Sequence, residues 1–278
     1  MAFQCETGPK NPVEILAFRP WEIAVNPFQV TPNTYYVSGQ SWVGAYLIDT
    51  KDGLILIDTG IVESLYLLVN SVYELGYQIT DIKKILISHA HIDHLGGAAA
   101  LKKLTGAPIY MSKEDTEFMK VSPKETIAID NLCRQQSFEV DCYYDDKEAI
   151  CLGNIEIHTK LTPGHTIGTT SFFWKETNPL TNAEYQIAMH GGVGAFSMAD
   201  AYYKTSKMLT PMLRDQFLSD IEEMKKYHVD IALPSHPNQI IIMDRAGSYT
   251  HVSQPYLDET VWSDFLEDRK NQVLSLLI

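Results

Sequence analysis

The sequence predicts an α/β fold built from layers of sheet and helix. Short apolar segments typical of buried strands alternate along the chain with longer segments of helical spacing, which is the pattern of layered α/β folds. Apolar segments at residues 85–87, 185–189 and 230–233 each run into a histidine-containing stretch. Candidate metal ligands come from early, middle and late segments, and no low-complexity linker divides the chain. One compact unit is therefore expected to bring them together.

Residues 1–32 are rich in proline and aromatic residues and are interpreted as an ordered arm that packs on a body formed by residues 33–278. The Asp52-Gly53 pair predicts a tight turn between two strands. Gly76 and Gly106 are expected to end helices, because glycine readily adopts the left-handed conformation found there. In the N-terminal half, strands are predicted at 34–37, 42–48, 54–60, 85–87 and 109–111, and helices at 62–76, 95–104 and 113–120.

Residues 121–154 show no clear period and are predicted to form loops. Pro211 is expected to break a largely helical segment, since proline cannot continue a helix. In the C-terminal half, strands are predicted at 155–159, 168–174, 185–189 and 230–236, and helices at 199–227 and 256–277. Histidines at positions 158, 228 and 251 lack supporting context and are interpreted as surface residues.

The stretch from Ser88 to Gly97, with the sequence SHAHIDHLGG, carries the strongest chemical signal. His89 and His91 are two residues apart, so in an extended segment both rings point to one side. Asp93 and His94 are adjacent and point in different directions, which suits a second ion. The two glycines that follow allow close backbone approach beneath the site. The stretch joins a strand to a helix, where open α/β sheets place their sites.

The composition narrows the classes of partner. The formal charge of −13 and the pI of about 5.1 disfavour general binding of nucleic acid or anionic membrane, so we expect a small-molecule substrate. No apolar run reaches membrane-spanning length. Residues 1–12 contain no stretch like a signal peptide, which predicts a cytoplasmic protein, or a periplasmic or secreted one if a leader was removed. Cys133, Cys142 and Cys151 are interpreted as free buried thiols.

The HxHxDH pattern of residues 89–94 resembles the metal-binding motif of the metallo-β-lactamase superfamily. The TPGHT stretch around His165 and the SHP stretch around His236 match the family's later histidines. The resemblance covers roughly residues 33–277 and implies a four-layer αββα sandwich. It also implies two zinc ions, the first held by His89, His91 and His165, and the second by Asp93, His94 and His236.

Other site residues follow from the same resemblance. Asp58 ends a predicted strand and is expected to support the metal ligands, with capping of the following helix as an alternative or additional role. Asp93 is expected to orient the attacking water while it binds metal. Many members of the family have a metal-bridging Asp where this chain has His190, and subclass B3 β-lactamases also lack it. His190 is therefore expected to support the ligands or line the pocket, with direct metal binding as the alternative.

The resemblance to subclass B3 implies a hydrolase that uses a metal-bound hydroxide to open a cyclic amide, most simply a β-lactam. The iron-binding branch of the superfamily usually has Glu where His91 stands, which favours zinc and hydrolysis. Subclass B3 enzymes tend to hold the substrate carboxylate with serines, of which only Ser197 is available, and substrate-contacting aromatics are expected within residues 121–154. A lactone or thioester hydrolase, or a non-catalytic metal-binding module, remains as an alternative.

Overall fold

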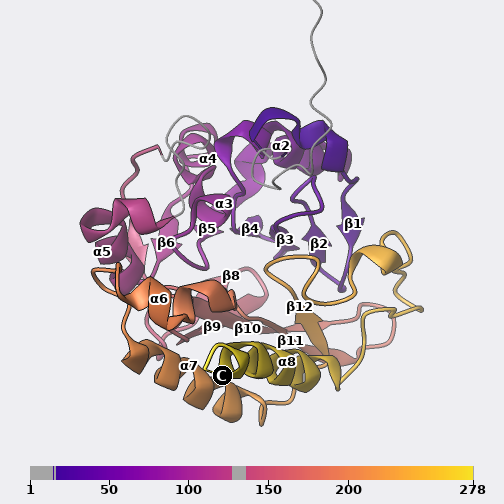
Figure 1. Cartoon of the computed structure of the whole chain (residues 1–278). Helices are drawn as coiled ribbons and strands as arrows, with labels where there is room; N and C mark the ends of the chain where they lie inside the picture. The colour runs from indigo at the N-terminus through magenta and orange to yellow at the C-terminus, as the bar shows by residue number, and fades with distance from the viewer. Residues whose placement is uncertain (1–14, 16, 127–135, 278) are drawn as a thin grey trace, which may run out of the picture.

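A computed structural model describes residues 15, 17–126 and 136–277 (Figure 1). The chain forms two sheets, and the strands of the first follow one another in space in sequence order. The sheet is antiparallel from β1 to β4 and parallel from β4 to β7. Its strands are β1 (Phe28–Gln29), β2 (Thr34–Tyr36), β3 (Tyr46–Asp49), β4 (Leu54–Ile57), β5 (Ile82–Leu86), β6 (Ile109–Met111) and β7 (Cys142–Tyr143).

The second sheet has five strands in the order β12-β11-β10-β9-β8, and only the pairing of β11 with β12 is parallel. Its strands are β8 (Ile150–Leu152), β9 (Ile155–Leu161), β10 (Thr170–Thr177), β11 (Glu184–Met189) and β12 (Ile231–Leu233). Along β9 the burial alternates, so one face of this strand packs inward and the other lies toward solvent.

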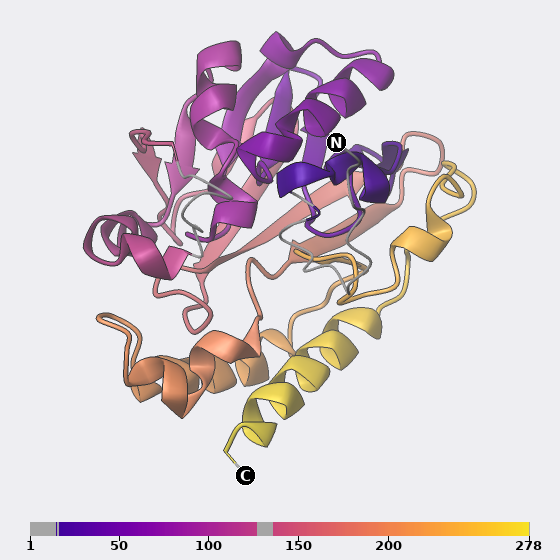
Figure 2. The ribbon, with the colours of Figure 1, turned by 45° about the horizontal axis from the view of Figure 1, so that its top comes forward.

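Helices cover the outer faces of both sheets, which gives the layer order α/β/β/α (Figures 1 and 2). The predicted four-layer sandwich is confirmed. The first sheet is covered by α2 (Leu65–Glu74), α3 (Ile92–Leu95), α4 (Ala98–Thr105) and α5 (Lys113–Val121). The second carries α6 (Asp200–Tyr203), α7 (Pro211–Met224) and α8 (Val261–Ser275).

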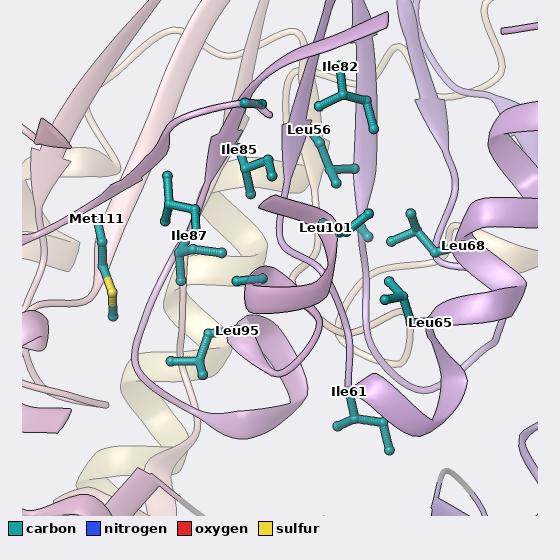
Figure 3. Close-up of a cluster of buried hydrophobic side chains, with 14 of the residues drawn as sticks. Leu56, Ile61, Leu65, Leu68, Ile82, Ile85, Ile87, Leu95, Leu101 and Met111 are labelled. Carbon is teal, nitrogen blue, oxygen red and sulfur yellow. The ribbon is translucent and has the colours of Figure 1, made fainter. Parts of the chain in front are cut away.

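Three apolar clusters fill the spaces between the four layers. Figure 3 shows the cluster between the first sheet and its helices, to which Ile85 of β5, Leu95 of α3 and Leu101 of α4 contribute. A central cluster joins the two sheets, and its members include Tyr46 of β3 and Trp174 of β10. Burying a Leu, Ile or Phe side chain contributes about 1.5–3 kcal/mol to the free energy of folding. The three clusters therefore stabilise the sheets whose strand ends carry the site.

Most predicted elements are present, and the differences have physical causes. Strand β5 begins at Ile82, three residues before the apolar run that predicted it, because Lys83 and Lys84 interrupt the apolar pattern although Ile82 and Lys84 pair with β4. Lys83 is exposed, and Lys84 Nζ donates a hydrogen bond to the hydroxyl of Tyr110. Strands β1, β7 and β8, each two or three residues long, were not predicted, because they lie in stretches without a clear period. The two latter strands lie in the region that was interpreted as loops.

Two predicted helices are interrupted. Gly96 and Gly97 separate α3 from α4, and a Cβ atom on Gly97 would lie 2.6 Å from the carbonyl oxygen of Thr59. The predicted close backbone approach at these glycines is confirmed. Pro211 occupies the first turn of α7, where its missing N–H costs nothing, and the expected break precedes it.

The cysteine prediction was half right. Cys142 and Cys151 are free thiols, but Cys142 is half-buried and Cys151 is exposed, because both lie on short strands at sheet edges. Cys133 lies outside the described residues. Within the described part of the chain, no helix has the length and apolar run needed to cross a bilayer.

The buried carboxylate of Glu176 joins the segment around β2 to the second sheet. It accepts four hydrogen bonds of between 2.5 and 2.9 Å, from Thr31 Oγ1, Asn33 N, Thr34 Oγ1 and Trp174 Nε1. Burial raises the pKa of Glu176, and the four donors oppose that rise. Part of the predicted arm is therefore tied to the body, and β1 extends the first sheet; the boundary at residue 32 stays a prediction.

Glu176→Gln should lower the free energy of unfolding by about 2 kcal/mol, because the new NH₂ group faces donors that lose their acceptor. Urea denaturation, compared with the exposed control Glu184→Gln, measures this effect. Equal unfolding midpoints for the two variants would show that the four hydrogen bonds contribute nothing to stability.

Candidate metal centre

All the predicted site residues follow strand ends, and most of them meet between the two sheets. Asp58 follows β4, the stretch from His89 to His94 follows β5, and His165 lies in the connection from β9 to β10. His190 follows β11 and His236 follows β12. Because the carboxyl ends of neighbouring parallel strands lie at one edge of a sheet, segments far apart in sequence come together there.

The side chains of His89, His91 and His165 form one group, with ligand atoms that all lie within 4.8 Å of one another. His91 Nδ1 lies 3.1 Å from His89 Nε2 and 3.0 Å from His165 Nε2. All three rings are buried. His91 Nδ1 thus faces two ring nitrogens at once, and one proton cannot bridge all three atoms.

Asp93, His94 and His236 form a second group of the same size. Asp93 Oδ2 lies 3.6 Å from His94 Nε2 and 3.4 Å from His236 Nε2, and the two ring nitrogens are 3.2 Å apart. The structure therefore brings together all six residues in the two groups of three that the sequence indicated.

Outer hydrogen bonds fix the orientation of three of these rings. Each ring donates its Nδ1 proton to an oxygen 2.8 Å away: His94 to Asp58 Oδ2, His165 to the carbonyl of Gly194, and His236 to the carbonyl of Trp42. A neutral imidazole carries one proton, so Nε2 of each ring keeps a lone pair directed inward. Such outer partners are typical of metal-binding histidines.

At His89, His91 and His165 burial favours the neutral ring that metal binding requires. It lowers the pKa of His165 to about 4, although the bond to Gly194 opposes the shift. Burial, reinforced by the neighbouring rings, also holds the pKa values of His89 and His91 well below the usual range. At His94 burial lowers the pKa, but the carboxylates of Asp93 and Asp58 outweigh it and the pKa ends above its ordinary value.

The donor set fits zinc. It consists of five imidazoles and one carboxylate with no thiolate, and such nitrogen and oxygen ligands suit Zn²⁺. His91 Nε2 is buried without a hydrogen-bond partner among the described residues, so Nδ1 is the atom that this ring directs toward its neighbours. Three protein ligands in each group match a catalytic zinc site, which keeps a position open.

Asp58 is held in an unusual backbone conformation, with φ of 60°. Its carboxylate accepts hydrogen bonds from the backbone N–H and the hydroxyl of Ser88, at 2.8 and 2.7 Å, and from His94. It makes no helix-capping bond, so the structure favours the support of metal ligands over capping. Strained backbone of this kind persists where surrounding contacts over-determine it.

Asp115 of α5 was missed by sequence reasoning, yet it connects two ligand-bearing loops. Its carboxylate accepts hydrogen bonds from Ala90 N, Thr166 Oγ1 and Gly168 N, each at 2.7 Å. Burial raises its pKa to about 7, against the effect of these donors. The sequence offered no distinguishing signal, since acidic residues are common in the first turn of any helix.

Neither His190 nor Ser197 lies where its side chain could line the substrate pocket. His190 is buried beside the ring of Phe217, accepts a hydrogen bond from Gly192 N, and lies outside both metal groups. Burial lowers its pKa to about 3, so the ring is neutral. Ser197 is buried and donates to the backbone carbonyl of His165, so it supports that loop and is not free to hold a substrate carboxylate.

The remaining histidines carry no comparable arrangement. His158 and His228 are exposed, as predicted, whereas His251 is half-buried against Tyr249. His228 lies near Asp230 and the exposed Glu259, and acidic surface groups of this kind are common without any ion.

A cavity of about 370 Å³ opens onto the ligands. Its volume lies in the range of small-molecule sites. Its aromatic walls are Trp42 and Phe196, whereas the sequence placed the substrate-contacting aromatics within residues 121–154. No described residue of that region lines the cavity, because residues 136–154 pass into β7 and β8 instead. Residues 127–135 lie outside the described chain.

A family model described as the metallo-beta-lactamase superfamily matches residues 43–178. The chain carries a metallo-β-lactamase superfamily domain. The match includes Asp58, the stretch from His89 to His94, and His165. His236 lies beyond it, and the structure joins this residue to the domain.

Solved β-lactamases share the fold along almost the whole chain. The native FEZ-1 metallo-β-lactamase from Legionella gormanii is 27% identical, with a TM-score of 0.79, over 92% of this chain and 96% of that one. BJP-1, a subclass B3 metallo-β-lactamase of Bradyrhizobium japonicum, is 24% identical with a TM-score of 0.79, over 94% and 98% of the two chains. The predicted similarity to subclass B3 is confirmed.

Curated relatives match a smaller share of this chain. The hydroxyacylglutathione hydrolase GloC of Haemophilus influenzae is 26% identical over 63% of this chain and 73% of its own length. An N-acyl homoserine lactonase of Bacillus thuringiensis is 27% identical over 47% of this chain and 57% of its own length. With several curated relatives, including this lactonase, the chain spans only about half of their length.

Asp115→Asn should weaken zinc binding by about 10–100-fold, because a side-chain amide cannot accept all three hydrogen bonds that hold the two loops. Titration of metal-free protein with zinc against a chromophoric chelator measures the affinity. The matched control is Glu114→Gln, an exposed neighbour on the same helix. Wild-type affinity in Asp115→Asn would remove its proposed positioning role.

Proposed function

We propose that this protein is a hydrolase that binds two zinc ions and opens the cyclic amide of a β-lactam. The observation that carries the proposal is the pair of three-residue ligand groups, which share one cavity and whose ring lone pairs converge. Zinc, when bound, lowers the pKa of a coordinated water toward 7 and polarises a carbonyl group.

The residues of the chain supply orientation and charge for this chemistry. His89, His91 and His165 would hold one ion, and Asp93, His94 and His236 the other. Asp93 lines the cavity, and its Oδ2 lies 3.6 Å from His94 Nε2 and 3.4 Å from His236 Nε2. This carboxylate would accept a hydrogen bond from the attacking water and orient it. Asp58 would keep the Nε2 lone pair of His94 directed inward.

The apolar walls would exclude bulk water from the reacting bond. Trp42, Ile61 and Phe196 line the cavity beside the ligands. The edge of the Trp42 ring contacts His236, with 5.8 Å between the ring centroids. Exclusion of water strengthens the electrostatic interactions within a site.

The choice of a β-lactam rests on the similarity to β-lactamases, which extends over 92% of this chain in the FEZ-1 comparison. A lactone or thioester hydrolase is the second candidate, because GloC and the homoserine lactonase are similar to 63% and 47% of this chain. The same two metal sites would serve all three reactions. A non-catalytic metal-binding module would keep the zinc and show no turnover.

The zinc-loaded protein should hydrolyse a chromogenic cephalosporin faster than an acyl homoserine lactone or an acyl-glutathione thioester. His89→Ala should abolish this turnover, because it removes one ligand of the first ion, whereas the exposed control His158→Ala should retain it. Initial rates on the three substrates, with and without chelator, measure the outcome. Faster lactone or thioester turnover would favour the second candidate, and chelator-resistant hydrolysis would contradict the zinc requirement.

A further inference from the structure

We infer that Arg269, on helix α8, is the specificity residue that binds a carboxylate of the substrate. This inference rests on the proposed function and names the substrate class more narrowly: cyclic amides that carry a free carboxylate. Arg269 lines the same cavity as the two metal groups. It lies far beyond residues 43–178, the range matched by the family model, so that comparison says nothing about it.

Arg269 is the one permanently cationic side chain among the described residues that line the cavity. The chain as a whole is acidic, with 35 Asp and Glu against 22 Lys and Arg, so its overall field repels anions. The zinc ions would attract the reacting group to the ligand side of the cavity, and Arg269 offers a separate cation on helix α8 for a substrate carboxylate. Arginine suits a carboxylate, because its guanidinium is always charged and donates charge-assisted hydrogen bonds.

The guanidinium is already oriented in the absence of substrate. It lies over the ring of Phe265, with Cζ 5.7 Å from the ring centroid, and Phe265 is itself buried. Only 14% of the Arg269 side chain is exposed. A partly desolvated and pre-oriented arginine loses little side-chain entropy when it binds an anion.

One nitrogen of the guanidinium is left for a ligand. Nη2 pairs with the neighbouring Asp268, whose side chain is 58% exposed, so this ion pair contributes little. Nε is buried without a partner, and Nη1 has no hydrogen bond to any described residue. Nη1 is therefore the donor that we assign to the substrate carboxylate, and the amides of Asn238 and Gln239 line the cavity with it.

No serine in the described part of this cavity can readily replace Arg269 in that role. Ser197 is buried and already bonded to the His165 loop. Ser235 lines the cavity, but it is buried and its hydroxyl donates to the side-chain oxygen of Gln239. The carboxylate contact therefore falls to the cation of α8, a helix that packs against β12 and α7 (Figures 1 and 2).

The kinetic test compares a cephalosporin with its methyl ester, which lacks the negative charge. Arg269→Gln should raise KM for the acid about tenfold and leave kcat and the ester kinetics unchanged. It removes one charge-assisted hydrogen bond that the substrate makes equally in the ground state and in the transition state. Arg269→Lys should give a KM for the acid between that of the wild type and that of Arg269→Gln. The matched control is Lys270→Gln, whose side chain pairs with Glu222 away from the cavity. Equal KM changes for acid and ester would overturn the inference.

A binding test separates failure of this inference from failure of the proposed function. A five-membered lactam carboxylic acid and its methyl ester, which resist opening, are titrated calorimetrically into zinc-loaded protein. The acid should bind wild type about tenfold more tightly than Arg269→Gln, while the ester should not distinguish them. If no β-lactam is hydrolysed, the proposed function fails, yet this preference still supports the carboxylate site. Equal acid affinities in the two proteins would overturn it.

Discussion

The site depends on one electrostatic constraint: ring nitrogens that carry lone pairs are packed against one another. His91 Nδ1 faces both His89 and His165, and His94 faces His236, at separations of 3.0–3.2 Å. Lone pairs in such contact repel, and a bound cation converts the repulsion into attraction. The outer hydrogen bonds of the rings to Asp58, Gly194 and Trp42 oppose their rotation away.

The arrangement of the two sheets brings loops from both of them together at one place. Asp115 links the loop after β5 to the loop after β9, and Glu176 links the segment around β2 to β10. Each is a buried carboxylate that accepts several hydrogen bonds across elements distant in sequence. Both contributions are tertiary, since neither residue belongs to a local motif. The sandwich therefore positions the ligands, and the loops that follow its strands shape much of the cavity.

The sequence predicted what local pattern encodes. The HxHxDH spacing, the turn before His165 and the strand before His236 located all six ligand candidates that the structure brings together, and alternation of strands and helices indicated the layers. Strands β7 and β8 were missed, because they lie in a stretch of charged and aromatic residues without a clear period. Asp115 and Arg269 were missed for another reason: their roles arise from packing between segments, which spacing along the chain does not reveal.

The central claim is that two zinc ions lie where the lone pairs converge. The most direct measurement is anomalous diffraction from crystals of the zinc-loaded protein, recorded on both sides of the zinc absorption edge. The account predicts two zinc peaks per chain, one bounded by His89, His91 and His165 and the other by Asp93, His94 and His236. A single peak, or a peak at His190 in place of either group, would contradict it.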